Sequence, residues 1–347
     1  MDDVARMTAE ERRDLFTEAA AQWGNIRPEV MEKDFWVCWT LKHVFDLGPP
    51  PAHLVFKGGT SLSKVYGLIE RFSEDIDLSL SREDLGFGGD RDPYSAPSRK
   101  KQDALIDELV ARCTEAIVGE LLPRLRERFA SILGPEGGAW SLAIDADDAQ
   151  TVNFIYPVGV LLGRSAPVRY LRPVVRLELG ARSDHWPAED QIVRPYAAEV
   201  IPGVFAKPEC HVRALSAERT FWEKATILHA EFHRAADSPS KERMTRHYYD
   251  LVKLYASPAG KRALEQADLL EAVVRHKKLF FRSGWANYDA ARPGTFHLVP
   301  PPGRLDQLRT DYAEMREVMI FGDSPEFDAL FETLTALELE INSLGAG

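Results

Sequence analysis

Two carboxylates stand two positions apart in the segment Asp75-Ile76-Asp77-Leu78-Ser79-Leu80, where polar and apolar side chains alternate. Successive residues of a β-strand point to opposite faces, so this pattern predicts a strand with Asp75 and Asp77 on one face and Ile76 in the core. Adjacent carboxylates repel each other unless a cation neutralises them, and their oxygens favour a hard divalent ion. We therefore predict that Asp75 and Asp77 bind Mg²⁺, with Mn²⁺ as an alternative. Alone, such a pair is typical of a solvated strand edge.

A glycine turn precedes the carboxylates in the segment Phe56-Lys57-Gly58-Gly59-Thr60-Ser61-Leu62-Ser63-Lys64. Glycines let a phosphate approach the backbone, and the N–H groups at the start of the following helix point towards that anion. Alone, the turn is typical of an ordinary helix cap. Separated by one short helix from a metal-binding pair, it indicates transfer chemistry on a nucleoside triphosphate. The predicted nucleotide-binding residues are Lys57, Gly58, Gly59, Thr60, Ser61 and Lys64.

The elements that position these residues follow from hydrophobic periodicity and turn residues. A short buried strand at 53–56 leads into the glycine turn, a helix from Thr60 to about Arg71 follows, and the aspartates lie on the next strand. This order of strand, helix and strand indicates an αβ lobe. Helices are also predicted at 8–22, from Pro28 to the prolines at 49–51, and at 100–133 with Pro123 as a candidate break. Strands are predicted at 140–144, 152–158 and 170–179.

The chain beyond residue 214 has helical periodicity over most of its length. We therefore predict an α+β fold with two lobes. Residues 1–210 form an N-terminal lobe with a mixed β-sheet, and residues 211–347 form a helical lobe. The helical stretches are expected near 217–234, 242–256, 261–276, 304–319 and 326–343.

Charge, hydropathy and cysteine content indicate which substrates and which cellular compartment to expect. The 347 residues carry a net charge of −11, which argues against a general nucleic-acid coat, yet residues 207–282 hold 15 basic and 10 acidic side chains. A polyanionic substrate would lie along that stretch. The start Met1-Asp2-Asp3 has no apolar leader, no segment could span a membrane, and three scattered cysteines form no disulfide framework. We expect a reduced, cytoplasmic protein with no membrane partner.

The two segments match the first parts of the signature of the nucleotidyltransferase superfamily, in which an apolar residue and G-[GS] precede D-h-[DE]. The signature continues with a third carboxylate on a later strand, flanked by apolar residues. Leu177-Glu178-Leu179 fits that pattern, and Asp145 is the rival candidate. We prefer Glu178 because its apolar neighbours are longer and more typical of a strand.

Two downstream segments resemble the later motifs of the AbiEii/AbiGii-type toxins, a family that includes the MenT toxins. They are Glu218–His229 and Arg246–Leu251, and with the first two segments they extend the resemblance over roughly residues 30–257. The resemblance implies a nucleotidyltransferase-like N-terminal lobe. It also implies that Lys224 contacts the triphosphate and that Asp250 is an essential carboxylate of the helical lobe.

The resemblance implies a function as well. Asp75, Asp77 and Glu178 would bind two Mg²⁺ ions, and a nucleoside monophosphate would move from an NTP to an acceptor, expected to be the 3′ end of tRNA. The protein would be the toxin of a toxin–antitoxin or phage-defence system with a cognate antitoxin. Three alternatives stay open: nucleotidylation of a protein, including the enzyme itself; a metal-dependent nuclease or phosphohydrolase; and a non-catalytic RNA-binding regulator.

Two other groups of residues could bind a ligand, but we interpret both as structural. His229 and His233 are four residues apart on a predicted helix and could share a zinc ion, but residue 230 is alanine and no third ligand is evident. We interpret them as partly buried helix histidines. The aromatic residues Phe35, Trp36, Trp39 and Phe45 could stack on bases, yet their helical spacing is more typical of a core.

Overall fold

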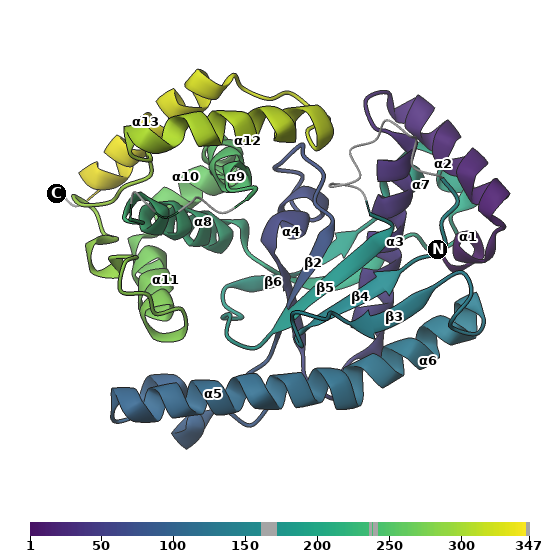
Figure 1. The fold of residues 1–347 in the computed structure, drawn as a ribbon, viewed down its shortest axis with the longest axis horizontal. Coiled ribbons are helices and arrows are strands. Elements are labelled where there is room, and N and C mark those ends of the chain that lie inside the picture. Colours follow the sequence, from purple (N-terminus) through teal and green to yellow (C-terminus); the bar gives the residue numbers. More distant parts are fainter. Residues whose placement is uncertain (161–171, 236–237, 239–241, 345–347) are drawn as a thin grey trace. The chain divides into compact units, whose positions relative to one another are not determined.

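The structure is a computed structural model that describes residues 1–160, 172–235, 238 and 242–344. The chain forms two compact units (Figure 1). The first contains Met1–Val65 and Phe72–Ala214, and the second contains Tyr66–Arg71 and Leu215–Gly347.

The first unit is built on a mixed β-sheet, which confirms the predicted α+β fold. Among the described residues the sheet has seven strands in the order β3-β4-β5-β2-β1-β7-β6. β2 is parallel to β5 and β1 is parallel to β7, whereas β1–β2, β3–β4 and β4–β5 are antiparallel. The strands are β1 (Leu54–Lys57), β2 (Asp75–Leu80), β3 (Ser141–Ile144), β4 (Thr151–Ile155), β5 (Val174–Gly180), β6 (Ala188–Val193) and β7 (Cys210–Leu215).

Helices cover the apolar side of this sheet. The predicted aromatic core is confirmed, because Phe35, Trp36 and Trp39 of α3 are fully buried and the ring of Trp39 stacks on Phe154 of β4 with centroids 5.7 Å apart. A capping box begins α2, since Thr8 and Glu11 exchange both hydrogen bonds there. The helices are α1 (Asp2–Arg6), α2 (Ala9–Trp23), α3 (Pro28–Leu47), α4 (Gly58–Lys64), α5 (Arg99–Ala116), α6 (Leu122–Leu133) and α7 (Tyr196–Val200).

Three sequence predictions in this unit need correction. The helix expected to reach Arg71 ends at Lys64, because Gly67 has φ +60°, outside the helical region. The helix expected over 100–133 is interrupted by a π-helical turn at Ile117–Leu121, just before Pro123, which cannot donate a backbone hydrogen bond. α5 and α6 still continue one another (Figure 1). The strand expected at 170–179 begins at Val174, and residues 170 and 171 lie outside the described residues.

The second unit is helical, as predicted. The stretch expected to form one helix at 261–276 forms two, because the chain leaves the helical conformation at Gln266, which has φ −113° and ψ 68°. Residues 236, 237 and 239–241 of the basic stretch lie outside the described residues. None of the helices in the described ranges is long and apolar enough to cross a membrane. The helices are α8 (Ala217–Phe232), α9 (Thr245–Tyr255), α10 (Pro258–Leu264), α11 (Ala267–Phe280), α12 (Leu305–Val318) and α13 (Phe327–Ser343).

The segment Tyr66–Arg71 belongs to the second unit although it follows α4 in the chain. The Tyr66 hydroxyl donates a hydrogen bond to the backbone oxygen of Leu215 at 3.0 Å, and Arg71 forms an antiparallel bridge with Ile320. The chain therefore passes from the first unit to the second, returns, and passes to the second again.

Candidate active site

The two aspartates lie on the same face of β2, and a third carboxylate lies beside them. Asp77 pairs with Glu178 of the parallel strand β5, so their side chains project from the same face of the sheet. Asp145 follows β3, which β4 and β5 separate from β2, and it accepts a hydrogen bond from Asn153 Nδ2 at 2.8 Å. The strand order thus brings Glu178 rather than Asp145 next to the aspartates.

Basic side chains neutralise part of this carboxylate row. Lys57 Nζ lies 3.8 Å from Asp77 Oδ1, and an Arg176 guanidinium nitrogen lies 3.7 Å from Glu178 Oε1. Within the described ranges, no three Asp, Glu, His or Cys side chains are already arranged as a metal-binding group. The donors nevertheless fit a hard cation, because the row offers only carboxylate oxygens from neighbouring strands and Asp77 and Glu178 retain solvent access.

Gly58 places the glycine turn directly against Asp77. Its φ of +82° is unfavourable for other residues, and a Cβ atom there would lie 2.0 Å from Asp77 Oδ2. Glycine is therefore required by both the backbone conformation and the contact. The first turn of α4 consequently starts beside the carboxylate.

Thr60 and Ser61 of α4 are buried, and their hydroxyl groups differ in bonding. Thr60 Oγ1 donates to the backbone oxygen of Asp75 at 2.5 Å and lies 2.9 Å from Ser73 Oγ, so it ties α4 to the start of β2. Ser61 Oγ has no hydrogen-bond partner in the part of the chain that the structure describes. Thr60 therefore has a positioning role here, whereas Ser61 has an unused hydroxyl.

Lys64, predicted to bind a nucleotide, is instead a buried counterion. Its Nζ lies 2.7 Å from Asp34 Oδ1 and 3.3 Å from the centroid of the Tyr196 ring. Burial opposes the charged form, but the adjacent Asp34 carboxylate holds the pKa of Lys64 above its ordinary value. The structure therefore places Lys64 in the interior, away from solvent.

Three consecutive charged residues on α3 have structural roles that the sequence motifs did not indicate. Glu32 accepts hydrogen bonds from the N–H groups of Gly159 and Val160, both at 2.7 Å, and burial raises its pKa. Lys33 forms an ion pair with Glu74, the residue immediately before Asp75, and Asp34 pairs with Lys64. Three charges in a row within the largely apolar stretch Val30–Leu41 were the available signal, because buried charges require partners.

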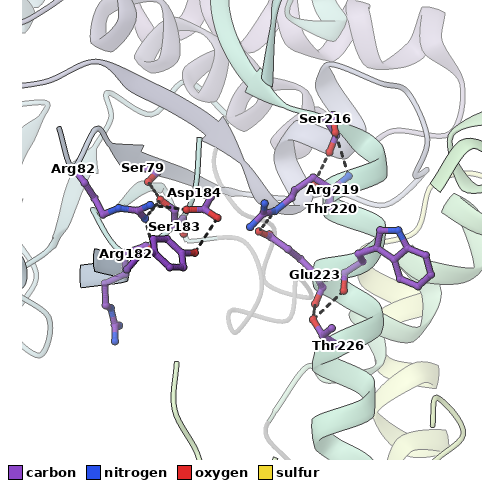
Figure 2. Close-up of polar contacts among 12 residues, drawn as sticks. Ser79, Arg82, Arg182, Ser183, Asp184, Ser216, Arg219, Thr220, Glu223 and Thr226 are labelled. Atoms are coloured by element: carbon purple, nitrogen blue, oxygen red, sulfur yellow. Dashed lines mark hydrogen bonds and ion pairs between the residues drawn. The ribbon is translucent and has the colours of Figure 1, made fainter. Parts of the chain in front are cut away.

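Arg82 fixes the loop that follows β5. It donates to the backbone oxygens of Arg182 and Ser183 at 3.3 and 3.1 Å and lies 2.6 Å from Asp184 Oδ1 (Figure 2). Ser79 Oγ, on the same face of β2 as Asp75 and Asp77, donates to the Ser183 oxygen at 3.3 Å. The loop is therefore attached at one end of the carboxylate row.

Lys224 and Asp250 form a buried ion network in the second unit. Asp250 is fully buried, and its two oxygens lie 2.6 and 2.7 Å from Arg71 Nε and a terminal nitrogen, while Lys224 Nζ lies 2.7 Å from Oδ2. Burial opposes ionisation, but the charges of Arg71 and Lys224 hold the pKa of Asp250 well below its usual range. Burial also lowers the pKa of Lys224, which Asp250 counteracts. Asp250 thus positions Lys224, and Arg71, which sequence analysis did not identify, completes the network.

The start of α8, the helix that carries Lys224, is fixed by further polar contacts. Ser216 Oγ accepts a hydrogen bond from the Arg219 N–H at 3.1 Å, and the buried Arg219 side chain lies 3.3 Å from Glu223 Oε1 (Figure 2). Thr226 Oγ1 donates to the backbone oxygen of Glu223 at 2.9 Å. Arg219 is therefore part of the helix framework and not an exposed cation.

His229 is buried, and its two ring nitrogens are both occupied. Nε2 lies 3.1 Å from the backbone oxygen of Asn287, and Nδ1 accepts from the His297 N–H at 3.1 Å. Burial lowers the pKa of His229 to about 4. A neutral imidazole with both nitrogens in hydrogen bonds is a core residue, as predicted, and has no lone pair left for a zinc ion.

The chain matches a protein family over most of its length. The family model described as "Nucleotidyl transferase AbiEii toxin, Type IV TA system" matches residues 39–333. No curated protein matches the sequence. Among solved structures, the chain is similar to MenT4, a nucleotidyltransferase toxin from Mycobacterium tuberculosis H37Rv, with 14% identity, a TM-score of 0.34 and coverage of 87% of this chain and 98% of that chain.

Proposed function

Because the chain belongs to the AbiEii nucleotidyltransferase toxin family, we propose that it transfers a nucleoside monophosphate from an NTP to an RNA acceptor, the 3′ end of tRNA. The observation that carries the proposal is the alignment of Asp77 with Glu178 on neighbouring parallel strands, with Asp75 on the same face. This arrangement supplies oxygen ligands beside a glycine turn, as transfer from a triphosphate requires.

Asp75, Asp77 and Glu178 would hold one or two Mg²⁺ ions. When bound, the metal supplies charge that favours ionisation of the attacking hydroxyl and departure of pyrophosphate. Glu178 is preferred over Asp145 as the third carboxylate because it faces Asp77 across adjacent strands. Lys57 and Arg176, which now lie near the carboxylates, would be released towards anionic substrate groups when the metal occupies the row.

The proposed reaction forms one bond to phosphorus and breaks another. An acceptor hydroxyl oxygen forms a bond to the α-phosphorus of the NTP, the bond between that phosphorus and the β-phosphate oxygen breaks, and pyrophosphate leaves. The hydroxyl proton passes to solvent. The backbone at Gly58 and Gly59 would approach the phosphates, and the buried Ser61 hydroxyl is available to donate a hydrogen bond.

The roles of Lys224 and Asp250 follow from the family resemblance together with their contacts. We assign Lys224 to the triphosphate, where an ammonium group stabilises departing pyrophosphate. Asp250 and Arg71 position that ammonium group, and Asp250 does not itself contact the substrate in this proposal. Thr60 and Lys64 are assigned positioning roles, because both side chains are buried in protein contacts.

A labelling experiment tests the proposal and its alternatives together. The purified chain is incubated with Mg²⁺, total RNA and each NTP labelled at the α-phosphate, with Asp77→Asn as the inactive control. We expect label in RNA of tRNA size. Label on protein alone would indicate protein nucleotidylation. NTP consumption without incorporation would indicate a hydrolase, and RNA binding without turnover would indicate a regulator. Growth arrest by the expressed chain, relieved by a co-expressed antitoxin, would test the toxin role.

A further inference from the structure

A pocket in the second unit is lined by one face of α11 and by the chain after it. Its volume is about 380 Å³. Leu270, Val274 and Lys278 follow one another at four-residue intervals, so they share one face of the helix. Tyr288 and the residues that follow it also line the pocket. None of these residues belongs to the carboxylate row, so the pocket is a separate feature.

The lining combines an apolar floor with a basic rim. Leu270 and Val274 supply the apolar surface of α11, while Arg275, Lys278 and Arg292 place three cationic side chains at the pocket. Glu271 and Asp289 also line it, so three positive charges face two negative ones. Leu270 is buried, whereas the three basic side chains are exposed. A ligand with a flat apolar part and an anionic part would match both features.

Lys278 of the basic rim has an anionic partner within the pocket. Lys278 forms an ion pair with Asp289, which also lines the pocket. The pair is exposed, so it is weak, and an incoming phosphate could replace the aspartate at the Lys278 ammonium group. Asp289 would therefore compete with the ligand for Lys278. Loss of the Lys278 charge should weaken ligand binding, whereas loss of the Asp289 charge should strengthen it.

We propose that this pocket binds one unpaired nucleotide of the RNA acceptor, an inference that rests on the proposed function. The base would lie between the apolar floor and Tyr288, and its phosphate would contact Lys278 and Arg292. Bases stack on aromatic side chains, and basic groups attract the RNA backbone. The pocket lies at the end of the basic stretch 207–282, where the charge of the chain favours a polyanion.

Binding of fluorescently labelled tRNA in Mg²⁺ without NTP tests this inference. The variants are Lys278→Glu, Asp289→Asn and the control Lys261→Glu, which makes the same charge change at an exposed position of α10 outside the pocket. We expect Lys278→Glu to weaken binding about tenfold and Lys261→Glu no more than about threefold. Asp289→Asn should tighten binding, because it frees Lys278.

Substitutions of Tyr288 test the stacking contact. Tyr288→Ala should weaken binding about tenfold, and Tyr288→Phe should restore it, since the aromatic face is kept. Melting temperatures establish that each variant is folded. Equal losses in Lys278→Glu and Lys261→Glu, or no gain in Asp289→Asn, would overturn the inference.

Two further measurements separate this inference from the proposed function. If wild-type protein labels RNA but the pocket variants bind it like the Lys261→Glu control, the pocket inference fails and the function stands. If wild-type protein neither binds nor labels RNA, both fail. A loss of affinity for free NTP in Lys278→Glu, with RNA affinity unchanged, would overturn the assignment to RNA.

Discussion

Gly58 and Asp77 are so close that a methyl group at residue 58 would lie 2.0 Å from the Asp77 carboxylate. Gly58→Ala should therefore displace Asp77 and lower the transfer rate at least about a hundredfold, since an error of 1 Å in a reacting group has that effect. The left-handed backbone adds a cost of about 1–2 kcal/mol to the free energy of folding.

Gly134→Ala is the matched control for that variant. Gly134 has φ +83°, nearly the value of Gly58, but a Cβ atom there meets nothing within 4 Å. Urea unfolding should give a similar loss of stability in Gly134→Ala, while its transfer rate stays at the wild-type level. Equal transfer rates in the two variants would contradict the role assigned to the Gly58 contact.

Glu178→Gln and Asp145→Asn compare the two candidates for the third carboxylate. Glu178 is the register partner of Asp77, whereas Asp145 is held by Asn153 in the turn after β3. We expect Glu178→Gln to lower transfer at least about a hundredfold, like Asp75→Ala and Asp77→Ala, and Asp145→Asn to change it by less than about threefold. Initial rates with saturating Mg²⁺ check this, and the reverse order would transfer the role to Asp145.

Removal of divalent metal should stop transfer without unfolding the protein. Lys57 and Arg176 neutralise part of the carboxylate row, so we expect the fold to persist without the ion. EDTA should abolish labelling, Mg²⁺ or Mn²⁺ should restore it, and the melting temperature should stay within about 2 °C. Melting on chelation would instead identify a structural metal.

Lys224→Met and Asp250→Asn should separate a functional cation from its support. Loss of Lys224 leaves the Arg71–Asp250 pair intact, so the variant should fold but lose most NTP turnover. Loss of the Asp250 charge leaves two buried cations without a counterion, which costs about 3–5 kcal/mol. Denaturant unfolding and NTP turnover check the two outcomes. Normal turnover in a folded Lys224→Met protein would remove Lys224 from the site.

Acidification should destabilise the second unit through His229. Its pKa is lowered to about 4 by burial, so between that value and about 6.5 the unfolded chain binds more protons than the folded chain. This contribution to stability is complete above pH 6.5 and is lost as the pH falls towards 4. From pH 7 to pH 5 the loss is about 2 kcal/mol.

Urea unfolding of His229→Gln at both pH values checks the source of that loss. The variant should be less stable than wild type at pH 7 but should lose less stability on acidification. His211→Gln, at an exposed position of β7, is the control and should retain the wild-type pH dependence. Burial also lowers the pKa of His185 in the first unit and of His247 in the second, so part of the wild-type loss should remain in His229→Gln.

Local sequence patterns predict the positions of some site residues but not of others. The alternation around Asp75 and Asp77 and the glycines before them reflect constraints within a few residues, so both could be predicted. β7 carries the same alternation and could have been predicted, whereas the exposed residues of β6 give no such pattern. The position of Glu178 beside Asp77 depends on sheet order, which local periodicity does not encode.

Long-range ion pairs explain the remaining differences. Lys64 was predicted to bind a phosphate because the sequence does not reveal that Asp34 lies beside it in the core. Arg71 and Asp250 are 179 positions apart, so no motif links them. A buried charge requires an oppositely charged partner, and the residue that becomes its partner is determined only by the folded chain.

The helical unit consists of two separate pieces of chain, Tyr66–Arg71 and Leu215–Gly347. No single continuous fragment of the second half therefore contains the whole unit. A cut at residue 210 separates Arg71 from Asp250, and a fragment containing only 211–347 keeps Lys224 as the remaining basic partner of that carboxylate. Recombination between relatives would have to transfer both pieces together. Exchange of the C-terminal half alone would join an Asp250 from one parent to an Arg71 from another, and the compatibility of that single pair would limit which chimaeras fold.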